Sequence, residues 1–204
     1  TVTRIALCED PNNADRLVAF YSASHEAYVQ ESWDGGATWK ILFKDHRVRR
    51  ADVHHTDIAI APGNSNTILL GTYRAYLSKD NGKNFEEVTQ PEYEHPQFAH
   101  DDIRGLYMKS PSDFYLATDG GVFRSTDTAN TWENISWKGL TAMQIYGIEQ
   151  LSKDTFLVGC QDMGYFMLQN KKWVQLGSYY GDGGDAIRTP QGTYILMGGT
   201  ARRI

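Results

Sequence analysis

Short runs of alternating apolar and polar residues recur along the whole chain, each of about the length of a strand. A period of two places successive side chains on opposite faces of an extended chain, so each run predicts a β-strand. Turn-forming segments separate the runs, as in Pro11-Asn12-Asn13, Pro62-Gly63-Asn64 and Ser110-Pro111-Ser112. No stretch of useful length has a helical period. The pattern predicts an all-β protein.

The predicted strands group in fours. We expect strands near residues 3–8, 16–21, 26–32 and 37–43; 56–61, 67–72, 75–79 and 84–88; 102–108, 113–117, 121–125 and 131–135; and 144–150, 155–160, 164–168 and 172–176. A fifth group begins near Asp185, reaches two strands, and stops at residues 201–204, where a third strand should start. These groups define repeat units at about 1–45, 54–90, 100–136, 144–177 and an incomplete 184–204.

One eight-residue motif recurs three times, between the third and fourth predicted strands of successive units. The copies are Ser32–Trp39, Ser78–Phe85 and Ser125–Trp132, with the shared pattern Ser-x-Asp-x-(Gly)-x-(Thr/Asn)-(Trp/Phe). Their serines are 46 and 47 residues apart. A fixed period in this range indicates a repeat architecture built from one supersecondary unit.

The chemistry of the motif is that of a tight turn. Its aspartate is placed to accept hydrogen bonds from the backbone amides of the turn, and its glycines permit positive φ. The third copy has Thr128-Ala129 in place of the glycines. We expect Trp39, Phe85, Trp132 and the later Trp173 to be buried in the core or between neighbouring sheets. The residues assigned a structural role are Ser32, Asp34, Gly36, Trp39, Ser78, Asp80, Gly82, Phe85, Ser125, Asp127 and Trp132.

The motif resembles the Asp-box, or bacterial neuraminidase (BNR) repeat. That repeat is found in sialidases, family 74 glycoside hydrolases, sortilin-type receptors and many bacterial surface proteins. The resemblance implies a β-propeller of four-stranded antiparallel blades, in which the box is a structural turn on the outer rim. Four blades and part of a fifth do not close a ring. We therefore predict that residues 1–204 form a single partial propeller, a fragment whose partners include the remaining blades.

The amino-acid composition argues against some classes of binding partner. The formal net charge of −5 and the pI near 5.6 argue against nucleic acid. The longest apolar runs have the length of a strand, so no membrane-spanning segment is predicted. Cys8 and Cys160 fall in different units, and we interpret them as small buried hydrophobes rather than a disulfide. The resemblance implies a secreted or cell-surface protein.

The candidate chemistry lies away from the motifs. In a propeller the first strand of each blade lines the central channel, and the loops after the second and fourth strands share one face. An alignment of the first strands places Asp57, Asp102, Tyr146 and Asp185 at equivalent positions. The turns after the second strands hold Tyr73, Arg74, Asp119 and Asp162. We expect ligand contacts from residues on this face: His55, Tyr73, Arg74, His100, Asp101, Tyr146 and Asp182.

Three functions fit this face. The first is a binding module for a glycan or a protein. The second is a glycoside hydrolase resembling family 74, with one carboxyl of a pair acting as acid and the other as base. The third is a structural subunit of a surface assembly. The catalytic candidates are Asp57, Asp102, Asp119, Asp162 and Asp185.

The same aspartates could instead have structural roles. They can cap loop amides or tie neighbouring blades together, and Ca²⁺ bound through their oxygens stays open as an alternative. No other metal or cofactor is predicted. The Arg-Ile-Pro segment that opens sialidase domains is missing, which argues against a sialidase. The sequence alone leaves open whether the protein is an enzyme.

Overall fold

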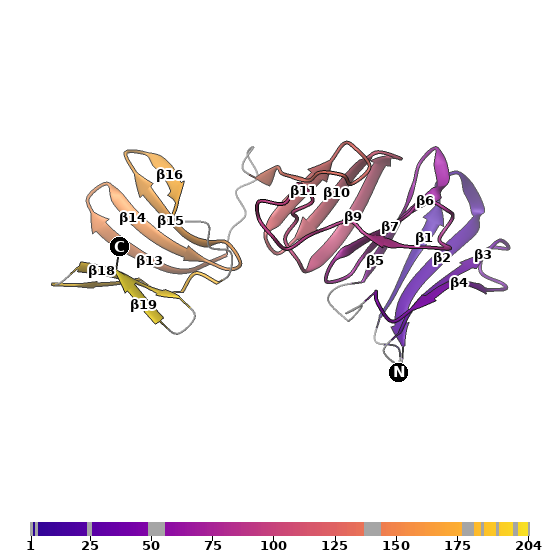
Figure 1. Cartoon of the computed structure of the whole chain (residues 1–204), viewed down its shortest axis with the longest axis horizontal. Coiled ribbons are helices and arrows are strands. Elements are labelled where there is room, and N and C mark those ends of the chain that lie inside the picture. Colours follow the sequence, from indigo (N-terminus) through magenta and orange to yellow (C-terminus); the bar gives the residue numbers. More distant parts are fainter. Residues whose placement is uncertain are drawn as a thin grey trace. The chain divides into compact units, whose positions relative to one another are not determined.

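The computed structural model describes residues 2, 4–23, 26–48, 56–136, 144–176, 182–184, 186–190, 192–197 and 200–203. The elements bounded within these ranges are β-strands, arranged in five antiparallel sheets (Figure 1). This confirms the all-β class. No helix that is long and apolar enough to cross a membrane occurs in this part of the chain.

The first three sheets have four strands each, and the strands follow one another in chain order. The first sheet contains β1 (Ile5–Asp10), β2 (Asn13–Ala23), β3 (Glu26–Ser32) and β4 (Lys40–Asp45). The second contains β5 (Asp57–Ala61), β6 (Asn64–Gly71), β7 (Ala75–Ser78) and β8 (Glu86–Glu87). The third contains β9 (Ile103–Ser110), β10 (Asp113–Thr118), β11 (Gly121–Ser125) and β12 (Glu133–Asn134). The fourth strands β8 and β12 are shorter than expected.

The fourth sheet repeats the pattern and the fifth is smaller. The fourth contains β13 (Ile145–Ser152), β14 (Thr155–Cys160), β15 (Gly164–Gln169) and β16 (Lys172–Gln175). The fifth contains β17 (Ala186–Thr189), β18 (Gly192–Met197) and β19 (Thr200–Arg203). The expectation of only two strands here is wrong, because β19 pairs with β18. The sequence between these two strands is Gly198-Gly199, a dipeptide that favours tight hairpins.

The chain divides into two compact units, Thr1–Leu140 and Thr141–Ile204. In the first unit, β1 lies against β5 and β5 lies against β9, so the first strands of successive sheets are neighbours (Figure 1). In the second unit, β13 and β14 lie against β17. Sheets stacked through their first strands are the arrangement of propeller blades.

Two-sided burial accounts for the apolar run in β6. Ile68 and Leu70 belong to a core shared with the first sheet, where Phe20 is also fully buried. Leu69, on the opposite face, belongs to a core shared with the third sheet and its Phe114. Burial of each such side chain contributes about 1.5–3 kcal/mol. The sheets are therefore held together by alternate residues of the same strand.

The three motif copies occupy the same register position. Ser32 is the cross-strand partner of Leu17, Ser78 of Ile68, and Ser125 of Phe114. Positions in the three sheets can therefore be compared residue by residue. The segment that joins the third strand to the fourth after each serine is called the corner below.

All three corners have the same hydrogen bonds. Each serine hydroxyl donates to the aspartate carboxylate over 2.7–2.8 Å and accepts from the backbone amide four residues after the serine over 2.8–2.9 Å. The aspartate in turn accepts from the amide of the Thr or Asn four residues further on over 2.8–3.0 Å and from its side chain over 2.6–2.8 Å. The corners are thus closed by contacts within eight residues, as the turn chemistry of the motif predicts.

The aromatic residues that end the motifs are not all buried. The Phe85 ring packs edge-on against Phe43 of the preceding sheet, with 4.9 Å between centroids, and Trp132 is 9% exposed. Trp39 is 40% exposed and Trp173 is 53% exposed, so the prediction of burial is wrong for these two. Trp39 belongs to the first sheet, and no earlier sheet among the described residues covers it. Trp173 lies on β16, the last strand of its sheet.

Candidate functional site

The first unit brings part of the predicted face together at one end of the second and third sheets. The carbonyl oxygen of Tyr73 accepts a hydrogen bond from the Asp102 amide over 2.9 Å, and that of Thr72 accepts from the Ile103 amide over 3.0 Å. These bonds join the β6–β7 turn to the start of β9. We call the six predicted site residues gathered here the turn cluster: Tyr73, Arg74, His100, Asp101, Asp102 and Asp119.

Arg74 is held between two carboxylates. Its Nη1 donates to Glu87 Oε1 over 3.0 Å, and its Nε lies 3.3 Å from Asp101 Oδ1. The side chains of Arg74 and Asp101 are only 18% and 17% exposed, so solvent screens their attraction less than that of a surface pair. The guanidinium also lies over the Tyr73 ring, 5.9 Å from its centroid. Sequence reasoning missed Glu87, because a two-residue strand carries no motif.

His100 is fixed by its neighbours. Its ring packs directly against Gly120, where any Cβ would collide with it. Its Nδ1 lies 2.9 Å from the Asp101 carbonyl oxygen. A carbonyl oxygen can only accept, so Nδ1 carries a proton in this contact. Gly120 is therefore required for the close approach of the imidazole.

Asp119 is paired with an arginine of the neighbouring strand. Arg104 Nε donates to Asp119 Oδ1 over 2.6 Å, and Arg104 Nη2 donates to Oδ2. This two-pronged geometry matches the fixed fork of the guanidinium. The Arg104 side chain is 40% exposed and that of Asp119 is 17% exposed. The pair therefore presents a positively charged group to solvent and keeps its acid partly covered.

Asp57 ties two sheets together. Its Oδ2 accepts from the Leu106 amide of β9 over 2.8 Å, and its Oδ1 accepts from the Ile58 amide over 2.9 Å. This agrees with the alternative that the acids link neighbouring blades. The alignment of Asp57 with Asp102 is wrong: counted from the corner serines, the strand register makes Gly105 the equivalent of Asp57.

The second unit holds its own small group. The Asp162 amide donates to Asp182 Oδ1 over 3.2 Å, and Gln161 Nε2 donates to Asp162 Oδ2 over 3.1 Å. Tyr146, on β13, is 47% exposed. His55 and Asp185 lie outside the described residues.

The candidate acids and histidines do not form a metal centre in the part of the chain that the structure describes. Within these ranges, no three His, Cys, Asp or Glu side chains converge in a way that could hold a metal ion. In the turn cluster, Asp101 and Asp119 face arginines. Cys8 and Cys160 are free thiols; Cys160 is buried as expected, whereas Cys8 is only partly buried.

No protein-family model and no curated protein matches the chain. Among solved structures, it is similar to a GH74 xyloglucanase from Xanthomonas campestris, with 14% identity, 94% of this chain and 34% of that chain covered, and a TM-score of 0.51. It also matches a GH74 enzyme from Niastella koreensis, with 16% identity, 95% and 33% coverage, and a TM-score of 0.49. A third match is YCF48 from Cyanidioschyzon merolae, with 12% identity, 95% and 63% coverage, and a TM-score of 0.45.

The fold is that of a partial β-propeller. This follows from the four-stranded antiparallel sheets and from the likeness to the xyloglucanase. The chain spans about a third of the length of the two GH74 enzymes. At such low identity the likeness concerns the fold and says nothing of catalysis.

Proposed function

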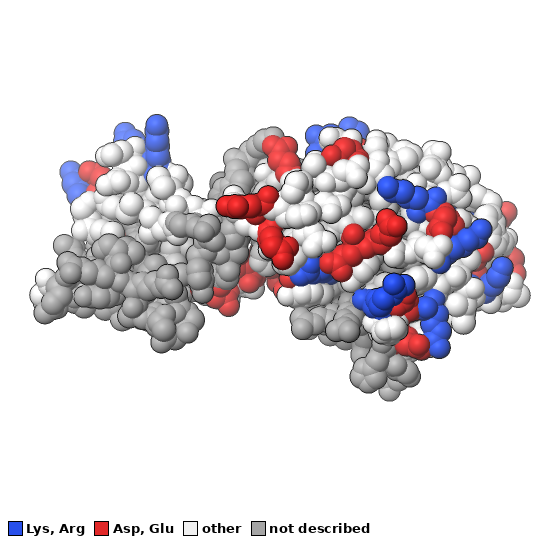
Figure 2. All heavy atoms as spheres, in the orientation of Figure 1, with Lys and Arg blue, Asp and Glu red and all other residues white. Residues whose placement is uncertain are grey.

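We propose that the chain is part of an Asp-box β-propeller that binds a glycan or a protein through the face carrying the turn cluster. The observation that carries the proposal is the placement of Arg74 between Glu87 and Asp101. A side chain that is already fixed loses little conformational freedom when a ligand arrives. On the face shown in Figure 2, basic and acidic side chains of the first unit lie next to one another, so both donors and acceptors are offered to a ligand.

Binding is favoured over glycoside hydrolysis by the partners of the acids. A hydrolase needs one carboxyl as proton donor and a second as base or nucleophile beside the sugar. Asp57 accepts from two backbone amides, and Asp119 is engaged by Arg104 through both oxygens. In the second unit, Asp182 accepts from the Asp162 amide. These contacts favour positioning roles for Asp57, Asp119 and Asp182.

The proposal also covers the blade organisation and the localisation of the protein. The two units belong to one propeller with blades at about 1–45, 54–90, 100–136, 144–177 and 184–204, completed by further blades. The protein is secreted or displayed at the cell surface, as the resemblance to Asp-box proteins implies. The three closed corners support the Asp-box assignment.

A glycan array combined with a polysaccharide-hydrolysis screen tests the proposal. The chain should bind a restricted set of glycans, or capture a protein ligand of defined identity, without releasing sugar. Arg74→Met should weaken binding at least tenfold, because it removes a fixed cation from the face. Lys83→Met removes an equal charge at a corner and should leave binding unchanged. Sugar release that is abolished by Asp57→Asn or Asp102→Asn would contradict the proposal.

A further inference from the structure

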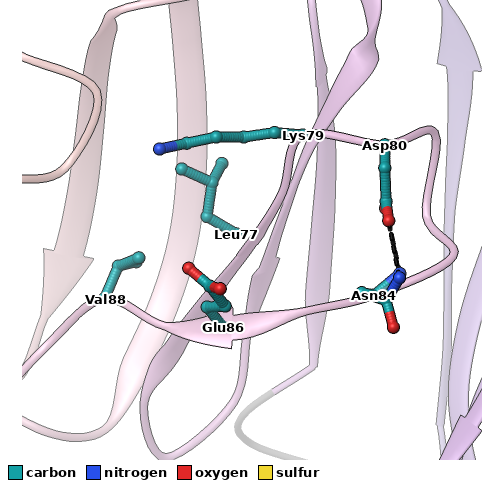
Figure 3. A pocket seen from close by; sticks show the side chains of 6 residues that line it. All are labelled: Leu77, Lys79, Asp80, Asn84, Glu86 and Val88. Carbon is teal, nitrogen blue, oxygen red and sulfur yellow. Dashed lines mark hydrogen bonds between the residues drawn. The ribbon is translucent and has the colours of Figure 1, made fainter.

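A hollow of about 180 Å³ lies beside the second corner, at the other end of β7 from Tyr73 and Arg74 (Figure 3). It opens on the β7–corner–β8 hairpin. The proposed function uses none of its residues. We call it the corner hollow, and its lining residues are Leu77, Lys79, Asp80, Asn84, Glu86 and Val88.

The second sheet differs from the first and third in the cross-strand pair next to its corner. The residue before the corner serine has an oppositely charged cross-strand partner in the first sheet, Glu31 with Lys40, and in the third, Arg124 with Glu133. In the second sheet the same register position pairs Leu77 with Glu86. Glu86 therefore faces an apolar side chain where its counterpart Glu133 faces a cation.

The hollow combines two unpaired charges with an apolar floor. Within the described part of the chain, neither the Lys79 ammonium nor the Glu86 carboxylate makes a hydrogen bond or an ion pair, with each other or with any other group. Leu77 and Val88 are 3% and 7% exposed and form the floor. In Figure 3, the side chains of Lys79, Leu77, Glu86 and Val88 extend to the same side of the hairpin.

The wall of the hollow is held in place by the corner. Asp80 Oδ2 accepts from Asn84 Nδ2 over 2.6 Å, the contact drawn in Figure 3. Asp80 Oδ1 accepts from Ser78 Oγ over 2.8 Å and from the Asn84 amide over 2.9 Å. These bonds fix the corner between Lys79 and β8, and so the backbone positions from which the two charged side chains extend.

We propose that the corner hollow binds a small zwitterion, a free α-amino acid with an aliphatic side chain. The ligand carboxylate meets the Lys79 ammonium, the ligand ammonium meets the Glu86 carboxylate, and the side chain covers Leu77 and Val88. Both contacts are charge-assisted hydrogen bonds. Both protein charges reach into solvent, so the affinity is in the millimolar range.

The other corners lack this combination. The equivalents of Lys79 are Trp33 and Thr126, and those of Glu86 are Lys40 and Glu133. Neither corner offers an ammonium and a carboxylate in those two places. We therefore expect a single amino-acid site among the three corners.

The test is a titration of the ¹⁵N-labelled chain with L-leucine, followed by amide chemical shifts. The shifts should saturate and should be confined to residues of β7, the second corner and β8. 4-Methylpentanoate lacks the ammonium, and 3-methylbutylamine lacks the carboxylate. Each should bind about fivefold more weakly or worse, because one charged contact is lost.

Substitutions of Lys79 and Glu86 test whether these two side chains bind the charged groups of leucine. Lys79→Met and Glu86→Gln should each weaken leucine binding about fivefold. Lys83→Met is the matched control, since Lys83 lies in the same corner but does not line the hollow, and its affinity should equal that of the wild type. Thermal unfolding of each variant checks that the fold is kept.

The proposal is overturned by any of three results. The first is the lack of a saturable shift at leucine concentrations that fill a millimolar site. The second is a set of shifts that maps outside the second corner. The third is equal leucine affinity of Lys79→Met and Lys83→Met. A failure of glycan or protein binding at the turn cluster leaves this titration unaffected, so the two proposals are tested separately.

Discussion

The indole Nε1 of Trp132 donates a hydrogen bond to the carbonyl oxygen of Val88 over 2.8 Å. Trp132 is the last residue of the third corner, and Val88 follows β8, the last strand of the second sheet. The indole of Trp39, at the equivalent place in the first sheet, instead donates to Gly36 within its own corner over 3.0 Å. The same motif position therefore joins two sheets in one copy and closes a turn in another.

Replacement of Trp132 by Phe should destabilise the first unit. Phenylalanine keeps a ring in the core but leaves the buried Val88 carbonyl without its donor, at a cost of about 1–3 kcal/mol. Trp39→Phe, at an exposed site, should cost less than about 1 kcal/mol. Urea unfolding of the two variants measures the difference. Equal losses would show that the bond between the sheets contributes nothing.

The third corner is strained where the first is not. Thr128 and Ala129 both have φ of 62°, a conformation taken by Gly35 and Gly36 in the first corner. The left-handed region costs an L-residue about 1–2 kcal/mol, and glycine loses about 0.5–1 kcal/mol through its freer unfolded chain. Thr128→Gly should therefore raise the free energy of unfolding by about 0.5–1 kcal/mol.

The substitution Gly35→Ala, in the first corner, is the control for Thr128→Gly. Nothing lies within 4 Å of a Cβ added at Gly35, so Gly35→Ala introduces backbone strain without a clash. It should lower the free energy of unfolding by about 1 kcal/mol. Chemical denaturation of both variants gives the two values. A stabilising Gly35→Ala would show that the left-handed conformation is not required there.

Acid should weaken the first corner. Hydrogen bonds from the Thr38 hydroxyl and amide lower the pKa of Asp34 from 3.8 to about 2. The unfolded chain therefore takes up the proton at a higher pH than the folded chain. The contribution of Asp34 to stability is complete above pH 3.8 and is lost as the pH falls toward about 2.

Asp34→Asn should remove that part of the pH dependence. Urea midpoints of the wild type should fall more steeply between the two pKa values than those of the variant. Asp15→Asn changes an exposed acid whose carboxylate takes no part in a corner, and it should keep the slope of the wild type. Parallel curves for wild type and Asp34→Asn would contradict the role given to the carboxylate.

Arg16 should be the most costly charge to remove. Its guanidinium is fully buried, 2.9 Å from Asp10 Oδ2 and 3.3 Å from Glu31 Oε2, and these carboxylates are 0% and 8% exposed. Arg16→Met leaves both acids buried without a cation and should cost about 3–5 kcal/mol. Arg47 is 77% exposed beside Asp45, so Arg47→Met should cost less than about 1 kcal/mol. Denaturant unfolding compares the two.

The strands and corners could be predicted because their causes are local. The hydroxyl of Ser78 and the carboxylate of Asp80 reach amides within six residues, so the spacing in the sequence already specifies the turn. Even the glycine-free third copy takes the same conformation, because its serine and aspartate still find their partners.

The turn cluster could be located but not described. The pairing of Arg74 with Glu87 and the contact of His100 with Gly120 depend on how separate hairpins meet. Asp102 lies out of register with Asp57, whose equivalent in β9 is Gly105, and no residue type marks that position. The exposure of Trp39 depends on which sheet covers it, which lies beyond any local pattern.

The corners also bear on how such a repeat can diversify. Serine and aspartate bind backbone amides and each other, while the residue between them takes no part in closing the turn. That intermediate place holds tryptophan, lysine and threonine in the three copies. A protein built this way can exchange surface chemistry repeat by repeat without disturbing its frame.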